Sequence, residues 1–319
     1  MCDGKRARTK DAPSLSQSPY SPTMPLSSSS DSKWQRLAIL NHHVRDERIQ
    51  FEESSHTYTI DGVKKGWKSC TGFLHDFFEP FNADEVITKM MRSRKWGADN
   101  KYFGMTPDAI KAQWAEKGRI ASEAGTRMHL DIEHAYNAMA VGRVEAKSES
   151  KSESESESEC WTLASGLEGL ALDGWAPHPS PEWDYFQAFQ REHVERYGLI
   201  PFRTEWLVFD EETKIAGSID MVFYKPDGTL AIYDWKRTEE LKMHNDYQKG
   251  LSPVEHLPDT NYWHYSLQLN VYRYILQKHY GVTVSELALV VLHPNNTSWK
   301  VARLNLMDSE VADMMDTRG

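Results

Sequence analysis

Two aspartates and one lysine stand close together in the sequence, with a spacing that suits metal-assisted chemistry. Asp220 and Asp234 flank a short segment, and Lys236 follows the second aspartate by two positions. Between them, residues 225–229 (Lys-Pro-Asp-Gly-Thr) predict a three-residue hairpin loop, because Pro and Asp suit a type I turn and Gly suits the left-handed position after it. In that register Asp220 lies directly opposite Asp234. Lys236 shares the face of Asp234, because side chains alternate along a strand with a period of two.

The residues that flank both aspartates are apolar at odd and even positions alike, which predicts strands buried on both faces. Two carboxylates that face each other there repel, unless one takes up a proton or a cation lies between them. A set of oxygen ligands favours Mg²⁺ or Mn²⁺ over zinc. Lys236 could then orient or deprotonate a water molecule and stabilise charge on a phosphate. The alternative is a structural ion pair between Asp234 and Lys236, with Asp220 unrelated to it.

The order of these residues resembles the PD-(D/E)XK nuclease superfamily, in which an aspartate, a hairpin and an Asp-x-Lys motif follow one another. Two motifs are similar to its RecB-like and lambda-exonuclease-like branch, which includes the mitochondrial genome maintenance exonucleases. They are Gly-Ser-Ile-Asp at 217–220 and a Gln-x-x-x-Tyr motif, whose Gln268 and Tyr272 share one face of a predicted helix. Ile219 replaces the eponymous proline. No cysteine cluster is present, so the iron–sulfur subset of this branch is excluded.

The resemblance implies roles for most of these residues. Asp220, Asp234 and the backbone carbonyl of Trp235 would hold the metal ion, and Lys236 would be the catalytic lysine. Gln268 and Tyr272 would line the site near the substrate phosphates.

The same resemblance points to an upstream helix. Gly125 and His129 fit a Gly-x-x-x-His setting, and Glu133 follows one helical turn later. His129 would be a further metal ligand; without the resemblance, a lone histidine on a helix is more often a buried hydrogen-bonding residue. Glu205, on the strand before Asp220, matches an acidic position of the branch, and Glu133 and Glu205 are candidates for supporting the ligands.

The pattern of elements predicts an α/β fold, a restriction-endonuclease-like core with a mixed central β-sheet flanked by helices and an N-terminal helical region. We expect strands at 49–53, 56–60, 204–209, 216–224, 229–235, 286–292 and 299–304, and helices starting at 106–107 and spanning 119–140, 182–197 and 262–280.

Composition divides the chain into a Ser/Pro-rich tail at 1–33, predicted to be disordered, and a single nuclease domain at 34–319. A low-complexity Ser/Glu insertion interrupts this domain at about 142–181. The three cysteines form no Cys-x-x-Cys pair, and the sequence shows no secretory leader and no apolar run long enough to cross a membrane. These features predict an intracellular protein of the cytoplasm or nucleus.

The net charge of −10 argues against DNA binding by overall charge, but its distribution is uneven. Residues 89–119 carry eight basic and three acidic residues, interleaved with aromatic ones, which suits a nucleic-acid strand. The alternative is an ordinary solvated helix face.

Together these features predict a Mg²⁺- or Mn²⁺-dependent DNA nuclease, with an exonuclease that processes DNA ends in replication, recombination or repair favoured by the resemblance. Two alternatives stay open: a catalytically silent DNA-binding module on the same fold, and a metal hydrolase acting on small phosphoesters. The sequence leaves strand preference, polarity and oligomeric state undecided.

Overall fold

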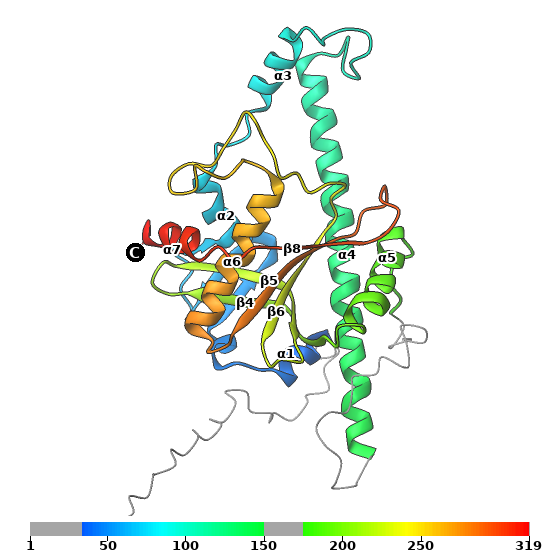
Figure 1. Ribbon diagram of the computed structural model, residues 1–319, viewed down its shortest axis with the longest axis vertical. Coiled ribbons are helices and arrows are strands. Elements are labelled where there is room, and N and C mark those ends of the chain that lie inside the picture. Colours follow the sequence, from blue (N-terminus) through cyan, green and yellow to red (C-terminus); the bar gives the residue numbers. More distant parts are fainter. Residues whose placement is uncertain (1–33, 150–174, 319) are drawn as a thin grey trace, which may run out of the picture.

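The computed structural model describes residues 34–149 and 175–318, in which a six-stranded mixed sheet is flanked by helices (Figure 1). The strands are β1 Ile49–Glu52, β2 Thr57–Ile60, β3 Lys68–Ser69, β4 Ile200–Asp210, β5 Ile215–Tyr224, β6 Leu230–Lys236, β7 Val284–Val291 and β8 Lys300–Arg303. The α-helices are α1 Arg36–Leu40, α2 Cys70–Leu74, α3 Ala83–Arg92, α4 Pro107–Glu149, α5 Pro181–Phe189, α6 Asn261–His279 and α7 Asp308–Asp316. Short 3₁₀ helices span Val44–Arg48, Glu53–Ser55 and His75–Phe77, and a π-helical turn at Gln190–Val194 continues α5.

The sheet is mixed because both hairpins and crossovers build it. β4, β5 and β6 pair antiparallel in sequence order, and β7 reaches β6 in parallel through α6. β8 adds an antiparallel edge strand, whereas β3 pairs in parallel with the start of β5. β1 and β2 form a separate antiparallel hairpin. The predicted α/β architecture with a mixed central sheet is therefore confirmed.

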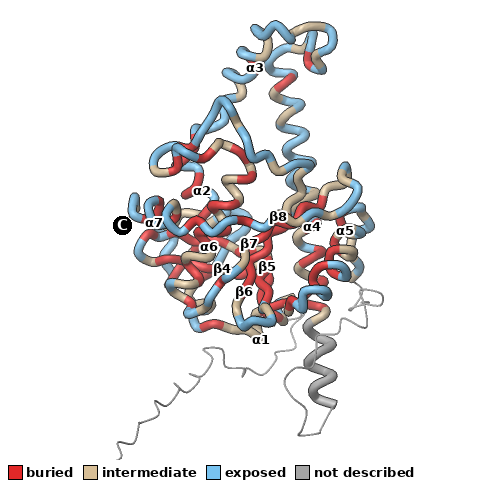
Figure 2. Tube along the Cα trace, viewed as in Figure 1, coloured by how far each residue is buried: buried red, intermediate tan, exposed pale blue. Residues whose placement is uncertain are grey.

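Helices cover both faces of this sheet and bury two separate apolar cores. One face packs against α2, α6 and α7 around Trp206, Ile232 and Leu269. The other face packs against α1, α4 and α5 around Tyr136 and Trp235. Figure 2 shows the buried residues concentrated in the sheet and its flanking helices. Both cores are needed because the central strands are apolar on both faces, as the sequence predicted.

A single helix of 43 residues, α4, replaces the two helices predicted from 106–107 and over 119–140. No proline follows Pro107 within this range, so nothing in the chain breaks the run of backbone hydrogen bonds. Its N-terminal part extends beyond the sheet and meets α3, forming an arm of residues 83–114 (Figure 1). The arm has a small core of its own around Ile87, Tyr102 and Ile110.

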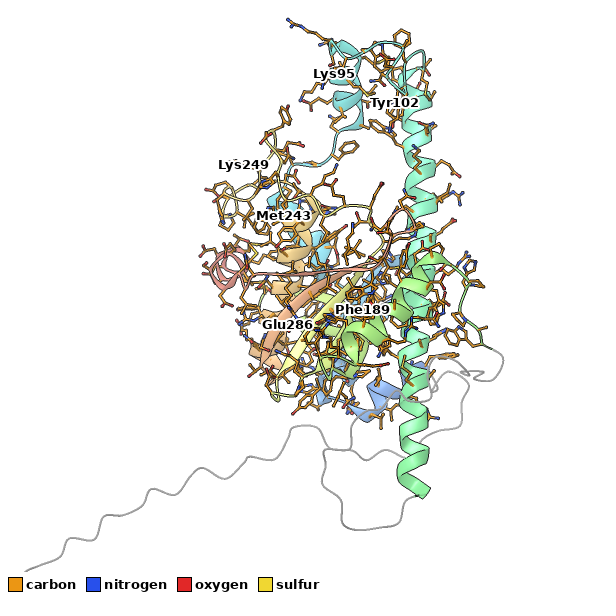
Figure 3. The ribbon with its side chains drawn as sticks, turned by 45° about the vertical axis from the view of Figure 1, so that its right-hand side comes forward. Lys95, Tyr102, Phe189, Met243, Lys249 and Glu286 are labelled. Carbon is orange, nitrogen blue, oxygen red and sulfur yellow. The ribbon has the colours of Figure 1, made fainter. Side chains whose placement is uncertain are left out.

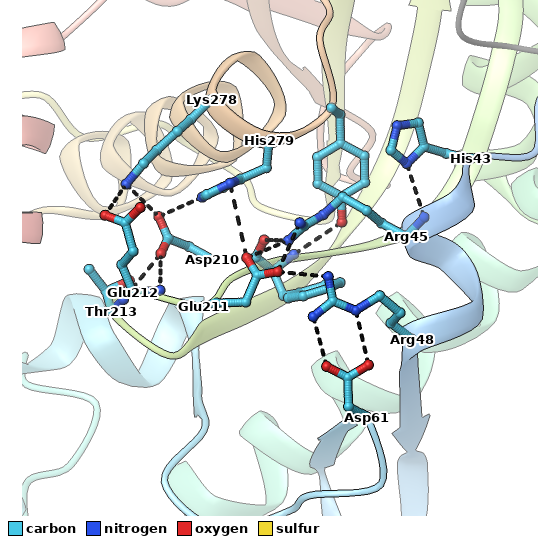
Figure 4. A network of polar contacts seen from close by, with 12 residues as sticks. His43, Arg45, Arg48, Asp61, Asp210, Glu211, Glu212, Thr213, Lys278 and His279 are labelled. Carbon is cyan, nitrogen blue, oxygen red and sulfur yellow. Dashed lines mark hydrogen bonds and ion pairs between the residues drawn. The ribbon is translucent and has the colours of Figure 1, made fainter.

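The 3₁₀ helix Val44–Arg48, directly before β1, is bound to the turn between β4 and β5 by a polar network (Figure 4). Arg45 and Arg48 both bind the Glu211 carboxylate, at 2.8 and 2.9 Å. On the other side of the turn, His279 and Lys278 of α6 bind Asp210. Because this network contains matched charges on three elements, it fixes the N-terminal segment on the core.

The predicted tail and the predicted insertion lie wholly or partly outside the residues that the structure describes. The tail at 1–33 and residues 150–174 of the predicted insertion lie outside them. At 142–149 the backbone continues α4, so the predicted start of the insertion does not coincide with the end of this helix. At the other end, Trp175 already packs against the core of α4 and α5. Within the described ranges, no helix is both long and apolar enough to cross a membrane.

Candidate active site

Three acidic residues lie in one row across three neighbouring strands. β4 and β5 pair on either side of Glu205 and Asp220 but not at that position. The pairing of β5 with β6 follows the predicted register and ends at Met221 and Tyr233, one residue before Asp220 and Asp234. The same row therefore interrupts both ladders, which frees backbone and side-chain groups for other partners.

At this row the side chains of β5 also switch from one side of the sheet to the other. Ile219 packs on the α6 side of the sheet, whereas Met221 packs on the α4 side, although residues two apart in a regular strand share a face. Opposite them, Glu205 has a φ of 43°, in the left-handed region that non-glycine residues seldom occupy. Strained backbone of this kind is concentrated at functional sites, because the surrounding structure must hold it in place.

Asp220 and His129 meet at the backbone of Trp235. The Oδ2 atom of Asp220 accepts a hydrogen bond from the Trp235 amide at 3.0 Å. The Nε2 atom of His129 lies 2.9 Å from the Trp235 carbonyl oxygen, and its Nδ1 lies 3.5 Å from Asp220 Oδ2. The structure thus brings together three of the predicted metal-binding residues from α4, β5 and β6.

Asp234 pairs with Lys236 instead of with Asp220. The Lys236 Nζ lies 2.6 Å from Asp234 Oδ2, and both side chains are largely buried. Burial, followed by the charge of Asp220, raises the pKa of Asp234 to about 6, although Lys236 acts in the opposite direction. Burial by itself lowers the pKa of Lys236, but the two aspartates outweigh it and raise that pKa above the ordinary lysine value.

Glu205 and Glu133 add two further buried carboxyl groups. The Oε2 atom of Glu205 accepts a hydrogen bond from the Ser218 hydroxyl at 2.8 Å. Burial and the nearby Asp220 raise the pKa of Glu205 to about 8, and burial raises that of Glu133 to about 7. Burial is the main cause of both shifts, and for Glu205 the neighbouring charge of Asp220 adds to it.

Gln268 and Tyr272 lie next to each other on α6, as their spacing predicted. The Gln268 Nε2 donates to the Tyr272 hydroxyl at 3.2 Å and reaches the Thr71 hydroxyl at 3.4 Å. The Tyr272 ring packs on Gly217, where an added Cβ would lie 2.5 Å from a ring carbon. Gly217 therefore allows β5 and α6 to approach closely beside the acidic row.

The donor atoms fit a divalent cation. One ligand atom each from His129, Glu205 and Asp220 lies within 4.8 Å of the others. A nitrogen and two carboxylate oxygens are acceptable ligands for Mn²⁺ and, with fewer precedents for the histidine, for Mg²⁺. The set differs from the predicted one, because Glu205 takes part in it while Asp234 is held by Lys236.

The structure also reveals site residues that the sequence reasoning missed. The Lys236 Nζ lies over the ring of Tyr265, 4.4 Å from the ring centre. Thr71, at the start of α2, contacts Gln268. Tyr265 could have been found from its spacing, since it precedes Gln268 by three residues on the same helix face. Nothing in the sequence places Thr71, because β3 and α2 reach the site only through tertiary packing.

The predicted basic segment, residues 89–119, forms most of the arm. Some of its basic side chains form ion pairs with nearby acids and others do not. Lys89, Lys111 and Arg119 form ion pairs with acidic residues on α3 and α4. Among the described residues, Arg92 and Lys95 have no such ion pair. Figure 3 shows Lys95 and Tyr102 in the arm, with Met243 and Lys249 on the loop between β6 and α6.

Comparison with known proteins agrees with this geometry. The sequence profile of the PD-(D/E)XK nuclease superfamily matches residues 104–317, which include every site residue named above except Thr71. The chain belongs to the PD-(D/E)XK nuclease superfamily. Nucleases of this superfamily act on DNA and use divalent metal ions, and the mixed α/β core of this chain is consistent with the restriction-endonuclease-like fold of the superfamily.

Solved structures give a weaker likeness. One is a protein of Eubacterium rectale named "Putative exonuclease", with 17% identity and a TM-score of 0.29, covering 42% of this chain and 47% of that one. Another, SSO0001, has 12% identity and a TM-score of 0.24, covering 41% of this chain and 54% of the other. The chain thus spans about half the length of either structure. No curated protein matches it significantly.

Proposed function

We propose that this protein is a Mg²⁺- or Mn²⁺-dependent deoxyribonuclease, and that it removes nucleotides from DNA ends as an exonuclease of the RecB-like and lambda-exonuclease-like branch. One observation supports the metal-dependent chemistry above all: His129, Glu205 and Asp220 converge within 4.8 Å, beside the Lys236–Asp234 pair. The preference for ends, and a role in replication, recombination or repair in the cytoplasm or nucleus, rest on the motifs shared with this branch.

Each residue has a distinct task in this proposal. A bound divalent cation would neutralise the carboxylates and polarise the scissile phosphate. Asp220, His129 and Glu205 would hold that cation, with Asp234 and the Trp235 carbonyl beside them, and Glu133, one helical turn after His129, would support the ligands. Lys236 orients the attacking water molecule and stabilises negative charge on the phosphate. Gln268 and Tyr272 hold a neighbouring phosphate.

The test is cleavage of single- and double-stranded DNA labelled at either end, compared with a closed circle, in Mg²⁺, in Mn²⁺ and in chelator. We expect linear DNA to be degraded from an end only when a metal ion is present. Asp220→Ala, Asp234→Ala and Lys236→Ala should each remove nearly all cleavage while the circular dichroism spectrum stays native. Near-normal turnover by any one of them in Mg²⁺ would show that the assigned site is wrong.

The same assay separates the alternatives. A silent DNA-binding module would bind the labelled DNA but leave it intact with every metal ion. An endonuclease would cut the closed circle as readily as the linear DNA. We favour catalysis because the chain retains Asp220, Asp234 and Lys236 together, whereas a silent DNA-binding copy would need none of them.

A further inference from the structure

The Lys236 ammonium has two direct side-chain partners among the described residues, one acid and one aromatic ring, and the charge of Asp220 also acts on it. Its ammonium nitrogen lies 2.6 Å from Asp234 Oδ2 and 4.4 Å from the centre of the Tyr265 ring. The carboxylate and the ring face therefore approach the same ammonium group from two different elements, β6 and α6.

The two partners respond differently to a divalent cation. A cation bound beside Asp234 draws on the same carboxylate charge that attracts Lys236, so it weakens their ion pair. The face of an aromatic ring attracts an ammonium group through its quadrupole and has no ligand atom to offer to a hard metal ion. The Tyr265 ring is thus the partner that Lys236 keeps when the acidic row is neutralised.

We infer that Tyr265 is a positioning residue, which holds the Lys236 ammonium in the active site by a cation–π contact while a metal ion occupies the acidic row. The inference rests on the proposed nuclease function, in which Lys236 acts on the substrate. A lysine has four rotatable side-chain bonds, so its placement at the end of β6 needs an outside support. Tyr265 provides it from the helix face that also carries Gln268 and Tyr272.

Tyr265 is itself firmly placed for this task. Its side chain is partly buried and packs against the apolar core that α6 covers, as do those of Leu241 and Trp263. The Trp263 indole donates to the backbone of Met243 at 3.1 Å, and Asn261 binds the backbone of Glu240 at 2.9 Å. The first turn of α6 is therefore tied to the loop that follows Lys236, so the ring and the ammonium group are held from both sides.

The chain offers a matched control on the same helix. Lys278 lies over the Tyr274 ring at 5.2 Å, but it pairs with Asp210 and Glu212 at the β4–β5 turn and takes no part in the acidic row. Tyr274→Leu removes this ring contact, together with the hydrogen bond that Lys278 donates to the Tyr274 hydroxyl at 3.1 Å, without touching Lys236. It measures the general cost of losing one aromatic ring from α6.

The decisive experiment compares turnover of the wild type, Tyr265→Phe, Tyr265→Leu and Tyr274→Leu with saturating Mn²⁺ and labelled DNA. We expect Tyr265→Leu to lower kcat by between about 2-fold and about 30-fold with little change in KM, which corresponds to the usual strength of a cation–π contact. Tyr265→Phe should keep a kcat close to that of the wild type, because it retains the ring face. Tyr274→Leu should also have the kcat of the wild type. Ring fluorination of a phenylalanine at position 265 should lower kcat stepwise, since each fluorine weakens the quadrupole while the packing hardly changes.

A readout independent of cleavage is the proton NMR shift of the Lys236 ε-methylene group with Mn²⁺ replaced by diamagnetic Mg²⁺. An aromatic ring shields protons that lie over its face, so the shift should be upfield in the wild type and in Tyr265→Phe and should vanish in Tyr265→Leu. Unchanged kcat in Tyr265→Leu, or no upfield shift in the wild type, would overturn the inference. A wild type that cleaves no DNA with any metal ion would instead refute the proposed function, and the NMR shift would still test the contact.

Discussion

The Nε2 atom of His129 lies 2.9 Å from the carbonyl oxygen of Trp235, although the two residues are 106 positions apart. A carbonyl oxygen can only accept, so the Nε2 atom is the donor of this hydrogen bond, and Nδ1 is the ring nitrogen that faces Asp220. This contact joins α4 to the end of β6 and sets the orientation of the imidazole in the acidic row.

His129→Ala should weaken metal binding without unfolding the protein. Loss of a nitrogen ligand or of its orienting partner lowers metal affinity by on the order of 10-fold or more. The measurement is titration calorimetry with Mn²⁺, together with the increase in melting temperature that Mn²⁺ confers. His256→Ala is the control, because His256 is exposed and its ion pair among the described residues is with Glu310, which is not part of the acidic row. An unchanged Mn²⁺ affinity would make His129 a structural residue.

In the metal-free protein, the stability contributed by the Asp234 and Glu205 carboxyl groups should fall as the pH rises from about 4 to about 8. The folded-state pKa values of Asp234 and Glu205, about 6 and about 8, lie above the ordinary values of 3.8 and 4.5 for these side chains. A carboxyl group with a raised folded-state pKa stabilises the fold fully below its unfolded pKa, and this stability is lost as the pH passes its folded value. Chemical denaturation in chelator across this range measures the slope.

Asp220→Asn should flatten that slope, because the charge of Asp220 contributes to raising both values. At pH 8 the metal-free variant should be as stable as the wild type or more stable by up to about 1 kcal/mol, the cost of opposed like charges. It should gain less stability from Mn²⁺ and should not cleave DNA. A variant clearly less stable in chelator would mean that Asp220 supports the fold rather than the metal ion.

Replacing Arg92 and Lys95 together by alanine should weaken DNA binding and flatten its salt dependence. Each lost phosphate contact lowers the slope of log affinity against log salt by between about 0.7 and about 0.9. The matched control is the pair Lys89→Ala and Lys111→Ala, whose side chains already bind Glu85 and Asp84. Equal slopes for the two double variants and the wild type would place the DNA away from the arm.

Gly217→Ala should disturb the site through Tyr272. The added methyl group would lie 2.5 to 3.0 Å from the tyrosine ring, so β5 or α6 must move, at a cost of about 1 to 3 kcal/mol. We expect a lower melting temperature and reduced cleavage. Gly118→Ala is the control, since nothing lies within 4 Å of its added Cβ, and alanine in a helix interior should stabilise the protein by up to about 1 kcal/mol. A Gly217→Ala variant with native stability and activity would contradict the close packing.

The sequence by itself determined the local geometry of the hairpin. The loop closes as expected, with the Lys225 amide donating to the Thr229 carbonyl at 2.9 Å and Gly228 in the left-handed region. The β5–β6 register follows from that loop, so the positions of Asp220 and Asp234 along the two neighbouring strands could be predicted. The apolar residues on both strand faces likewise predicted helices on both sides of the sheet, because such strands must be covered twice.

Only the tertiary structure decided which charged groups meet. Glu205 reaches the row through a left-handed backbone conformation, which local sequence preference disfavours and which the packed sheet maintains. The regular alternation of side chains along β5 is also interrupted at Asp220. This residue therefore contacts Trp235 and His129, while Asp234 faces Lys236 and α6. Contacts between residues 71 and 268, or 129 and 235, depend on how helices pack across the sheet, and no periodicity within one segment contains that information.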